Sequence, residues 1–163
     1  MVTRFRLAPM SPVILVLTVF LWLLPVAFFV AAFTHHRLFV LPALFLLFMY
    51  VWIWLWFRPT AFVVSSTDVE IIWPLRRRSI GRDTITSVRR IDRPELRSQV
   101  GWGMRVGAGG LWGGFGYLWT TRRGLVRLYV SRVEDLVWIE RGRETPWLIT
   151  PEQPDAFIRA LIC

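Results

Sequence analysis

The stretch GAGGLWGGFGYLW, residues 107–119, places glycines directly beside large aromatic side chains, which ordinary linkers do not do. Three structures could use it: a phosphate-binding loop, a flexible hinge, or a folded piece of β-sheet. A P-loop needs a Lys after its last glycine, and the chain contains no Lys. The dinucleotide-binding pattern fails too, because Trp112 stands where that pattern requires its third glycine. The sequence therefore excludes both glycine-rich phosphate loops.

The hinge is disfavoured because the stretch carries six large apolar side chains, which are costly to leave in water. Glycines in a sheet allow sharp bends and close backbone approach, while aromatic side chains cover the gaps beside them. We therefore predict a β-hairpin with Gly113 and Gly114, or a close neighbour, at its tip or at a bulge. The expected structural glycines of this hairpin are Gly109, Gly110, Gly113, Gly114 and Gly116.

The composition indicates a membrane protein with a positively charged surface. Of the 163 residues, 55% are hydrophobic and ten are Trp, which is too apolar for a typical soluble domain. The formal net charge of +9 favours an anionic partner or surface. The single cysteine, Cys163, excludes a disulfide within the chain and a cysteine metal site.

Two apolar runs near the N-terminus predict two transmembrane helices. Residues 12–33 and 38–57 would span about 33 Å and about 30 Å as helices, close to the thickness of a bilayer. Only the His35-His36-Arg37 turn separates them. An alternative is that the first run is a cleaved signal peptide with Val30-Ala31-Ala32 as its cleavage site. The length of the first run and the second run that follows it favour the helical hairpin.

The arginines predict the orientation of this hairpin in the membrane. Arg4 and Arg6 precede the first helix and Arg58 follows the second, whereas Arg37 stands alone in the turn. By the positive-inside rule, both termini should be cytoplasmic. We expect a cytoplasmic N-terminal segment over residues 1–11, the transmembrane hairpin over 12–57, and a cytoplasmic domain over 58–163.

The region after residue 58 is predicted to be mainly β-sheet closed by one helix. Its apolar residues occur in short segments bounded by turn residues. Thr150, Pro151 and Gln153 form a capping-box pattern, and apolar residues at helical spacing follow, so a helix should begin there. The predicted strand segments are 60–67, 69–73, 85–91, 125–131, 136–140 and 147–149.

The stretch from Thr60 to Ile162 resembles the bacterial pleckstrin-homology-like (bacterial PH) domain family, whose members are often described as domains of unknown function. The resemblance rests on the glycine-and-aromatic hairpin, the strand LVRLYVS, the RGR turn and the terminal helix, together with RRRSIGRDTITSV at 76–88. Gly81 stands where the family would have proline. The resemblance implies an all-β, partly open barrel of two near-orthogonal antiparallel sheets, capped by the C-terminal helix. Two preceding transmembrane helices are common in the family.

Residues suited to catalysis are scarce and scattered. His35 and His36 lie in the predicted turn between the helices, with no nearby acidic residue or cysteine to complete a metal site. The serines of the β-rich region have no histidine there to act as a base. We therefore expect no enzyme, no cofactor and no metal, with an enzyme of unknown type as a remote alternative.

The charges that indicate a function are the arginines after the second helix. Arginines at the cytoplasmic face of a membrane contribute about 1 kcal/mol each to attraction by anionic lipid. The alternative is that they only set topology. The first functional hypothesis is a scaffold or binding module for an unknown protein partner, and the second is a regulator that contacts anionic lipid headgroups; nucleic acid is not expected. The candidate lipid-contacting residues are Arg76, Arg77, Arg78, Arg82, Arg89 and Arg90.

Overall fold

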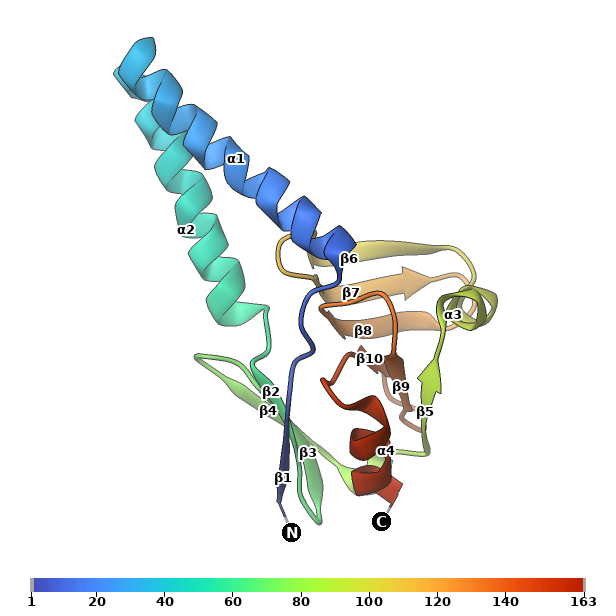
Figure 1. Cartoon of the computed structure of the whole chain (residues 1–163). Helices are drawn as coiled ribbons and strands as arrows, with labels where there is room; N and C mark the ends of the chain where they lie inside the picture. The colour runs from blue at the N-terminus through green and yellow to red at the C-terminus, as the bar shows by residue number, and fades with distance from the viewer. Residues whose placement is uncertain (1, 163) are drawn as a thin grey trace.

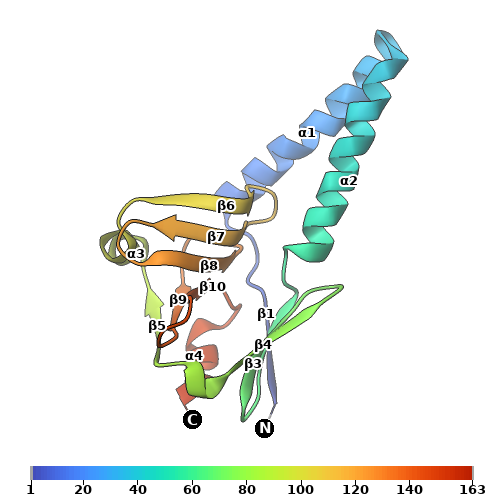
Figure 2. The same ribbon diagram turned by 180° about the vertical axis from the view of Figure 1, so that it is seen from behind.

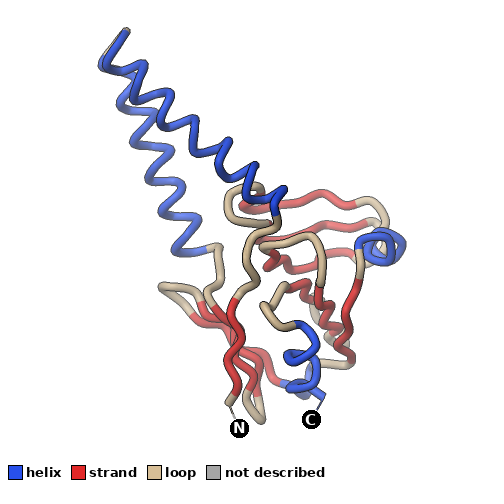
Figure 3. The backbone as a smooth tube through the Cα atoms, in the orientation of Figure 1, coloured by secondary structure: helices blue, strands red, loops and turns tan. Residues whose placement is uncertain are grey.

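A computed structural model describes residues 2–162 and shows a long helical hairpin standing on a β-rich domain (Figures 1 and 3). The first helix, α1, spans Pro12–Thr34. A single 3-10 turn at Arg37–Phe39 joins it to α2, Val40–Trp56. These bounds lie within a few residues of those predicted from the apolar runs.

The two helices are long and apolar enough to cross a membrane. Their outward side chains are large and exposed, among them Phe20, Phe33 and Phe45. A hydrogen bond joins the two helices: the Tyr50 hydroxyl on α2 donates to the Leu21 carbonyl on α1 at 2.8 Å. Exposed apolar surface of this extent is unfavourable in water and suits contact with lipid.

The first sheet contains a strand that sequence reasoning missed. Its order is β1-β2-β3-β4, all antiparallel. The missed strand is β1, Thr3–Arg6, which lies before the helices in the chain and pairs with β2, Ala61–Val64, after them. The remaining strands are β3, Asp68–Ile72, and β4, Arg77–Gly81. The helical hairpin therefore emerges between two neighbouring strands of one sheet.

The second sheet has six strands in the order β5-β9-β10-β8-β7-β6. The expectation of purely antiparallel sheets was wrong at one pair, because β10 runs parallel to β8. The reason is that β9 and β10 form a hairpin whose second strand lies between β9 and β8. The strands are β5 Ser87–Ile91, β6 Gly103–Gly109, β7 Gly114–Thr120, β8 Gly124–Val130, β9 Leu136–Glu140 and β10 Trp147–Ile149.

The glycine-rich stretch forms the β6–β7 hairpin, with residues 110–113 as its turn. The Gly110 amide donates to the Gly113 carbonyl at 2.9 Å across this turn. A side chain at Gly113 would place its Cβ 2.3 Å from the Val130 carbonyl oxygen, and the residue has a φ of 151°. Glycine is therefore required there by both space and backbone conformation.

Two short helices complete the domain. Helix α3, Arg93–Val100, was not predicted; the Asp92 side chain caps it by accepting from the Glu95 amide at 2.9 Å. Helix α4 spans Pro154–Ile162, so the predicted start of this helix at Thr150 was wrong. The Thr150 hydroxyl instead accepts from the Ser131 amide at 2.9 Å, which holds Thr150 inside the domain rather than at a helix end.

The main core lies where the two sheets and α4 meet. Trp147, Phe62 and Phe157 are fully buried in it. Phe5 from β1 packs against Phe157 with ring centroids 5.3 Å apart. The predicted arrangement of two N-terminal apolar helices, two sheets and a closing C-terminal helix is confirmed, and its core includes a residue from before the helices.

Candidate functional site

The turn of the β6–β7 hairpin packs against the lower ends of both apolar helices. The Trp112 ring contacts Trp54 at 4.8 Å between centroids and also lies near Trp22 and Tyr50, at 6.5 Å each. The Thr18 hydroxyl accepts from the Trp112 amide at 3.0 Å and lies 3.1 Å from the Gly110 carbonyl oxygen. These contacts fix the hairpin relative to α1 and α2.

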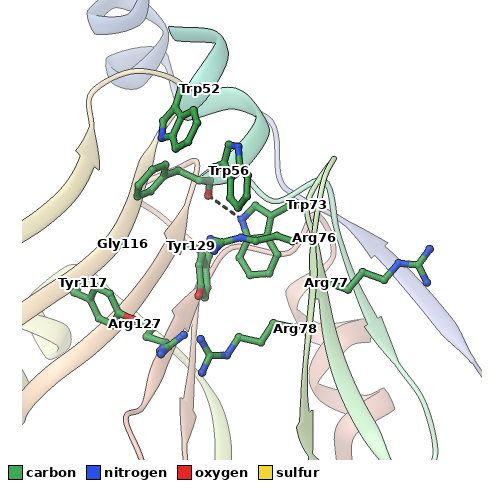
Figure 4. A pocket seen from close by; sticks show the side chains of 11 residues that line it. Trp52, Trp56, Trp73, Arg76, Arg77, Arg78, Gly116, Tyr117, Arg127 and Tyr129 are labelled. Atoms are coloured by element: carbon green, nitrogen blue, oxygen red, sulfur yellow. Dashed lines mark hydrogen bonds between the residues drawn. The ribbon is translucent and has the colours of Figure 1, made fainter. Parts of the chain in front are cut away.

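A cavity of about 450 Å³ opens beside this junction, below the end of α2 (Figure 4). Its walls come from the C-terminal end of α2, the β3–β4 hairpin and the adjoining strands β7 and β8. Its lining contains four arginines and no acidic residue. The lining residues are Trp52, Trp56, Phe57, Trp73, Arg76, Arg77, Arg78, Gly116, Tyr117, Arg127 and Tyr129.

Aromatic side chains fix the wall of the cavity nearest the helices. Trp52 and Trp56, one turn apart on α2, stack with centroids 5.3 Å apart. The Trp73 indole donates to the Phe57 carbonyl at 3.0 Å and meets Tyr129 edge to face at 5.4 Å. Tryptophans at the end of a membrane helix are typical of the headgroup layer. The cavity therefore lies at the depth where lipid headgroups would lie if the helices span a bilayer.

The arginines of the cavity differ in their surroundings. The Arg76 guanidinium lies over the Trp73 ring, 4.4 Å from its centroid, and Arg127 lies 5.1 Å from the Tyr117 ring. Arg78 and Arg127 extend toward one another from opposite walls, whereas Arg77 points away (Figure 4). The Arg127 Nε is buried and has no hydrogen-bond partner among the described residues. Two guanidinium groups thus converge on one part of the cavity.

No acidic side chain within residues 2–162 forms an ion pair with any of these four arginines. The positive charge of the cavity also affects Arg141, which is buried nearby. Burial lowers the pKa of Arg141; the Glu144 carboxylate opposes this, and the positive charges of Arg78 and Arg127 add to the lowering. The cavity is therefore a region of uncompensated positive charge.

The other arginines singled out in the sequence lie elsewhere. Arg82 donates to the Leu161 carbonyl at 2.7 Å and so holds the end of α4. Arg89 pairs with Glu95 at the start of α3. Arg90 pairs with Asp135 and lies 3.8 Å from Asp155. These three side chains already contact protein groups, and the structure does not bring them to the cavity.

Sequence reasoning missed Arg127 and the aromatic side chains around it. Arg127 is an isolated basic residue within a strand, and only the register Tyr117↔Arg127 between β7 and β8 places it on the same face as Tyr117. Tyr117, in the aromatic hairpin, offered a partial signal. Trp52 and Trp56 were recognised only as residues of the membrane boundary.

Residues 60–162 match the family described as "Bacterial PH domain". The chain belongs to the bacterial PH domain family. The matched region begins at β2 and ends with α4, so β1 lies outside it although it completes the first sheet. Neither the curated proteins nor the solved structures include a match to this chain.

Proposed function

We propose that this chain is a non-catalytic, membrane-anchored binding module whose cavity holds the phosphate of an anionic lipid headgroup. The observation that carries the proposal is the convergence of Arg78 and Arg127 in a cavity without acidic residues, next to the end of α2. Guanidinium groups bind phosphate through paired, charge-assisted hydrogen bonds. An anion between them would also offset their mutual repulsion.

A lipid fits this cavity better than a free anion does. The cavity volume is within the range of small-ligand sites and is larger than a bare phosphate requires. Trp52 and Trp56 line the cavity on the side of the helix, where a neighbouring lipid would enter from the bilayer. The membrane also supplies lipid at high local concentration, so weak intrinsic affinity suffices.

The proposal includes a location at the cytoplasmic face of a bacterial cell membrane, with both termini cytoplasmic. The distribution of arginines supports this orientation. The pairing of β1 with β2 supports placing both flanks of the helical hairpin on one side. Anionic lipids of the inner leaflet would then be the available ligands.

Native mass spectrometry of the full chain released from phosphatidylcholine nanodiscs that also hold phosphatidylglycerol tests the proposal. The wild type should retain phosphatidylglycerol, and the double variant Arg78→Gln/Arg127→Gln should retain at least about tenfold less, since a charged hydrogen bond contributes about 1.5–3 kcal/mol. Arg143→Gln, at an exposed turn, is the matched control and should bind as the wild type does.

A second arm separates lipid from free anion. Soluble glycerol phosphate should displace the retained lipid poorly. Displacement at low concentration would instead indicate a soluble phosphate ligand, and equal lipid retention by all variants would refute the cavity as the site.

A protein partner is the second candidate, as the scaffold hypothesis requires. The observation that favours a protein partner is β6, a seven-residue strand at the edge of its sheet. A strand of another protein could pair with this edge. A crosslink from Val106 to a single protein in native membranes, unaffected by Arg78→Gln/Arg127→Gln, would support this candidate.

A further inference from the structure

A second exposed feature lies at the other end of the β6–β7 hairpin from its turn. Trp102, just before β6, is 74% exposed, and Trp119 on β7 is 61% exposed. Met104, Trp119 and Leu125 are direct cross-strand neighbours on β6, β7 and β8, so they form one row on one face. Trp102, Met104 and Trp119 together line a shallow hollow of about 400 Å³. These four residues are called the Trp102–Trp119 surface below.

Exposed tryptophans of this kind are unusual on a surface that faces only water. Burial of these side chains is favourable, because it removes apolar area from water. The Trp102–Trp119 surface therefore favours a contact that the described chain does not supply.

The position of this surface is fixed relative to the membrane helices. The turn of the same hairpin is held against α1 and α2 through Trp112 and Thr18. Figures 1 and 2 show β6 as the strand of the six-stranded sheet nearest the helices, extending sideways from the base of α1. The hairpin thus reaches out along the side of the domain from which the helices leave.

The charge around this surface points to an anionic partner. Residues 96–133 contain six arginines and no acidic residue. Of these, Arg123 and Arg132 form ion pairs with Glu140 and Asp135, and Arg127 lines the cavity below α2. Arg105 and Arg122 are exposed in this region, at β6 and at the β7–β8 turn. Tryptophan together with arginine, on a segment continuous with membrane helices, is the combination that the interfacial layer of an anionic bilayer favours.

We propose that the Trp102–Trp119 surface is a second membrane contact, which inserts its apolar side chains into the headgroup layer of the same leaflet that surrounds α1 and α2. Membrane helices are commonly tilted, and a tilt toward this side would bring the hairpin toward the surface. The domain is then held at two points, the helical hairpin and this surface. The contact is independent of ligand binding in the Arg78–Arg127 cavity.

Spin-label accessibility in the full chain tests this contact. In a Cys163→Ser background, labels are attached to Met104→Cys and, separately, Leu125→Cys, which leaves both tryptophans in place. A label at Asp83→Cys, exposed in the short helix next to α4, is the control at the remote end of the domain. The protein is placed in vesicles of phosphatidylcholine with a minority of phosphatidylglycerol.

Labels at 104 and 125 should collide more with oxygen, which concentrates in lipid, than with a water-soluble nickel chelate; the label at 83 should show the reverse. Trp102→Ser should shift the label at 104 toward the nickel chelate, and its high exposure means that the fold should survive. If labels at 104 and 125 behave like the label at 83, the proposal is wrong. Shielding from both reagents would also overturn it, since a protein would then cover the surface.

Discussion

At the scale of single residues, Gly110 in the turn of the β6–β7 hairpin allows the contact with the helices. A Cβ on Gly110 would lie 3.0 Å from the Leu17 side chain of α1, and Gly110 has a φ of 94°. The glycine allows the turn to approach the helix, and Trp112 then fills the space between the two helices. At this turn, a glycine and a large aromatic side chain together make the contact with the helices.

Gly113→Ala should destabilise the protein by about 2 kcal/mol or more, because the new Cβ would clash with the Val130 carbonyl and strain the backbone. The midpoint of thermal unfolding in detergent measures this. Gly109→Ala is the matched control: its Cβ would lie at an ordinary 3.4 Å from the Arg105 side chain. Equal midpoints for the two variants would contradict this account of the hairpin.

Single residues could be assigned a role from the sequence only where the residues they act with lie close by in the chain. Arg76, Arg77 and Arg78 were recognised because three charges occur together. Arg127 was not, because it becomes part of the cavity only through strand register. Thr150 was misread because its capping pattern is local, while its actual partner, Ser131, is 19 residues away.

At the scale of elements, helices and strands that their own residues indicate were mostly predicted. Strands that form only by pairing with a segment far away in the chain were not. The segments 136–140 and 147–149 coincide with β9 and β10. Helix α3 had a readable signal, Asp92 followed by Pro94 and Glu95, which was overlooked. Strand β1 had none, since four residues with two arginines form a strand only by pairing across the helical hairpin.

Phe5→Ala should lower stability by about 3 kcal/mol, because Phe5 is buried against Phe157 and its loss leaves a cavity in the main core. Thermal unfolding of the full chain in detergent measures the effect. Arg4→Ala, at the exposed neighbouring position of β1, should change little. If Phe5→Ala unfolds at the temperature of the wild type, β1 is not part of the folded domain in solution.

At the scale of the whole molecule, the domain holds both ends of the helical hairpin at its base. The Ala8 amide donates to the Thr150 carbonyl at 2.9 Å, and the Ser131 hydroxyl donates to the Ala8 carbonyl at 2.6 Å. The chain is therefore attached to the domain both before α1 and after α2. A movement of α2 would change the shape of the cavity, because Trp52 and Trp56 of this helix line it.

The proposed topology predicts opposite results at two fusion sites. A reporter active only in the cytoplasm should be active when fused after Cys163 and inactive when inserted at His35, because the arginines flank the helical hairpin on one side. A reporter active only outside the cytoplasm should give the reverse pattern. Cytoplasmic activity at His35 with none at the C-terminus would mean a reversed hairpin.

The most direct test of the central claim is a crystal structure of the full chain grown in a lipid mesophase that contains phosphatidylglycerol. The account predicts a lipid phosphate between Arg78 and Arg127, with its oxygens about 2.7–2.9 Å from both guanidinium groups. An acidic side chain of another protein molecule between these arginines, or a cavity without lipid while phosphatidylglycerol is ordered elsewhere around the helices, would contradict it.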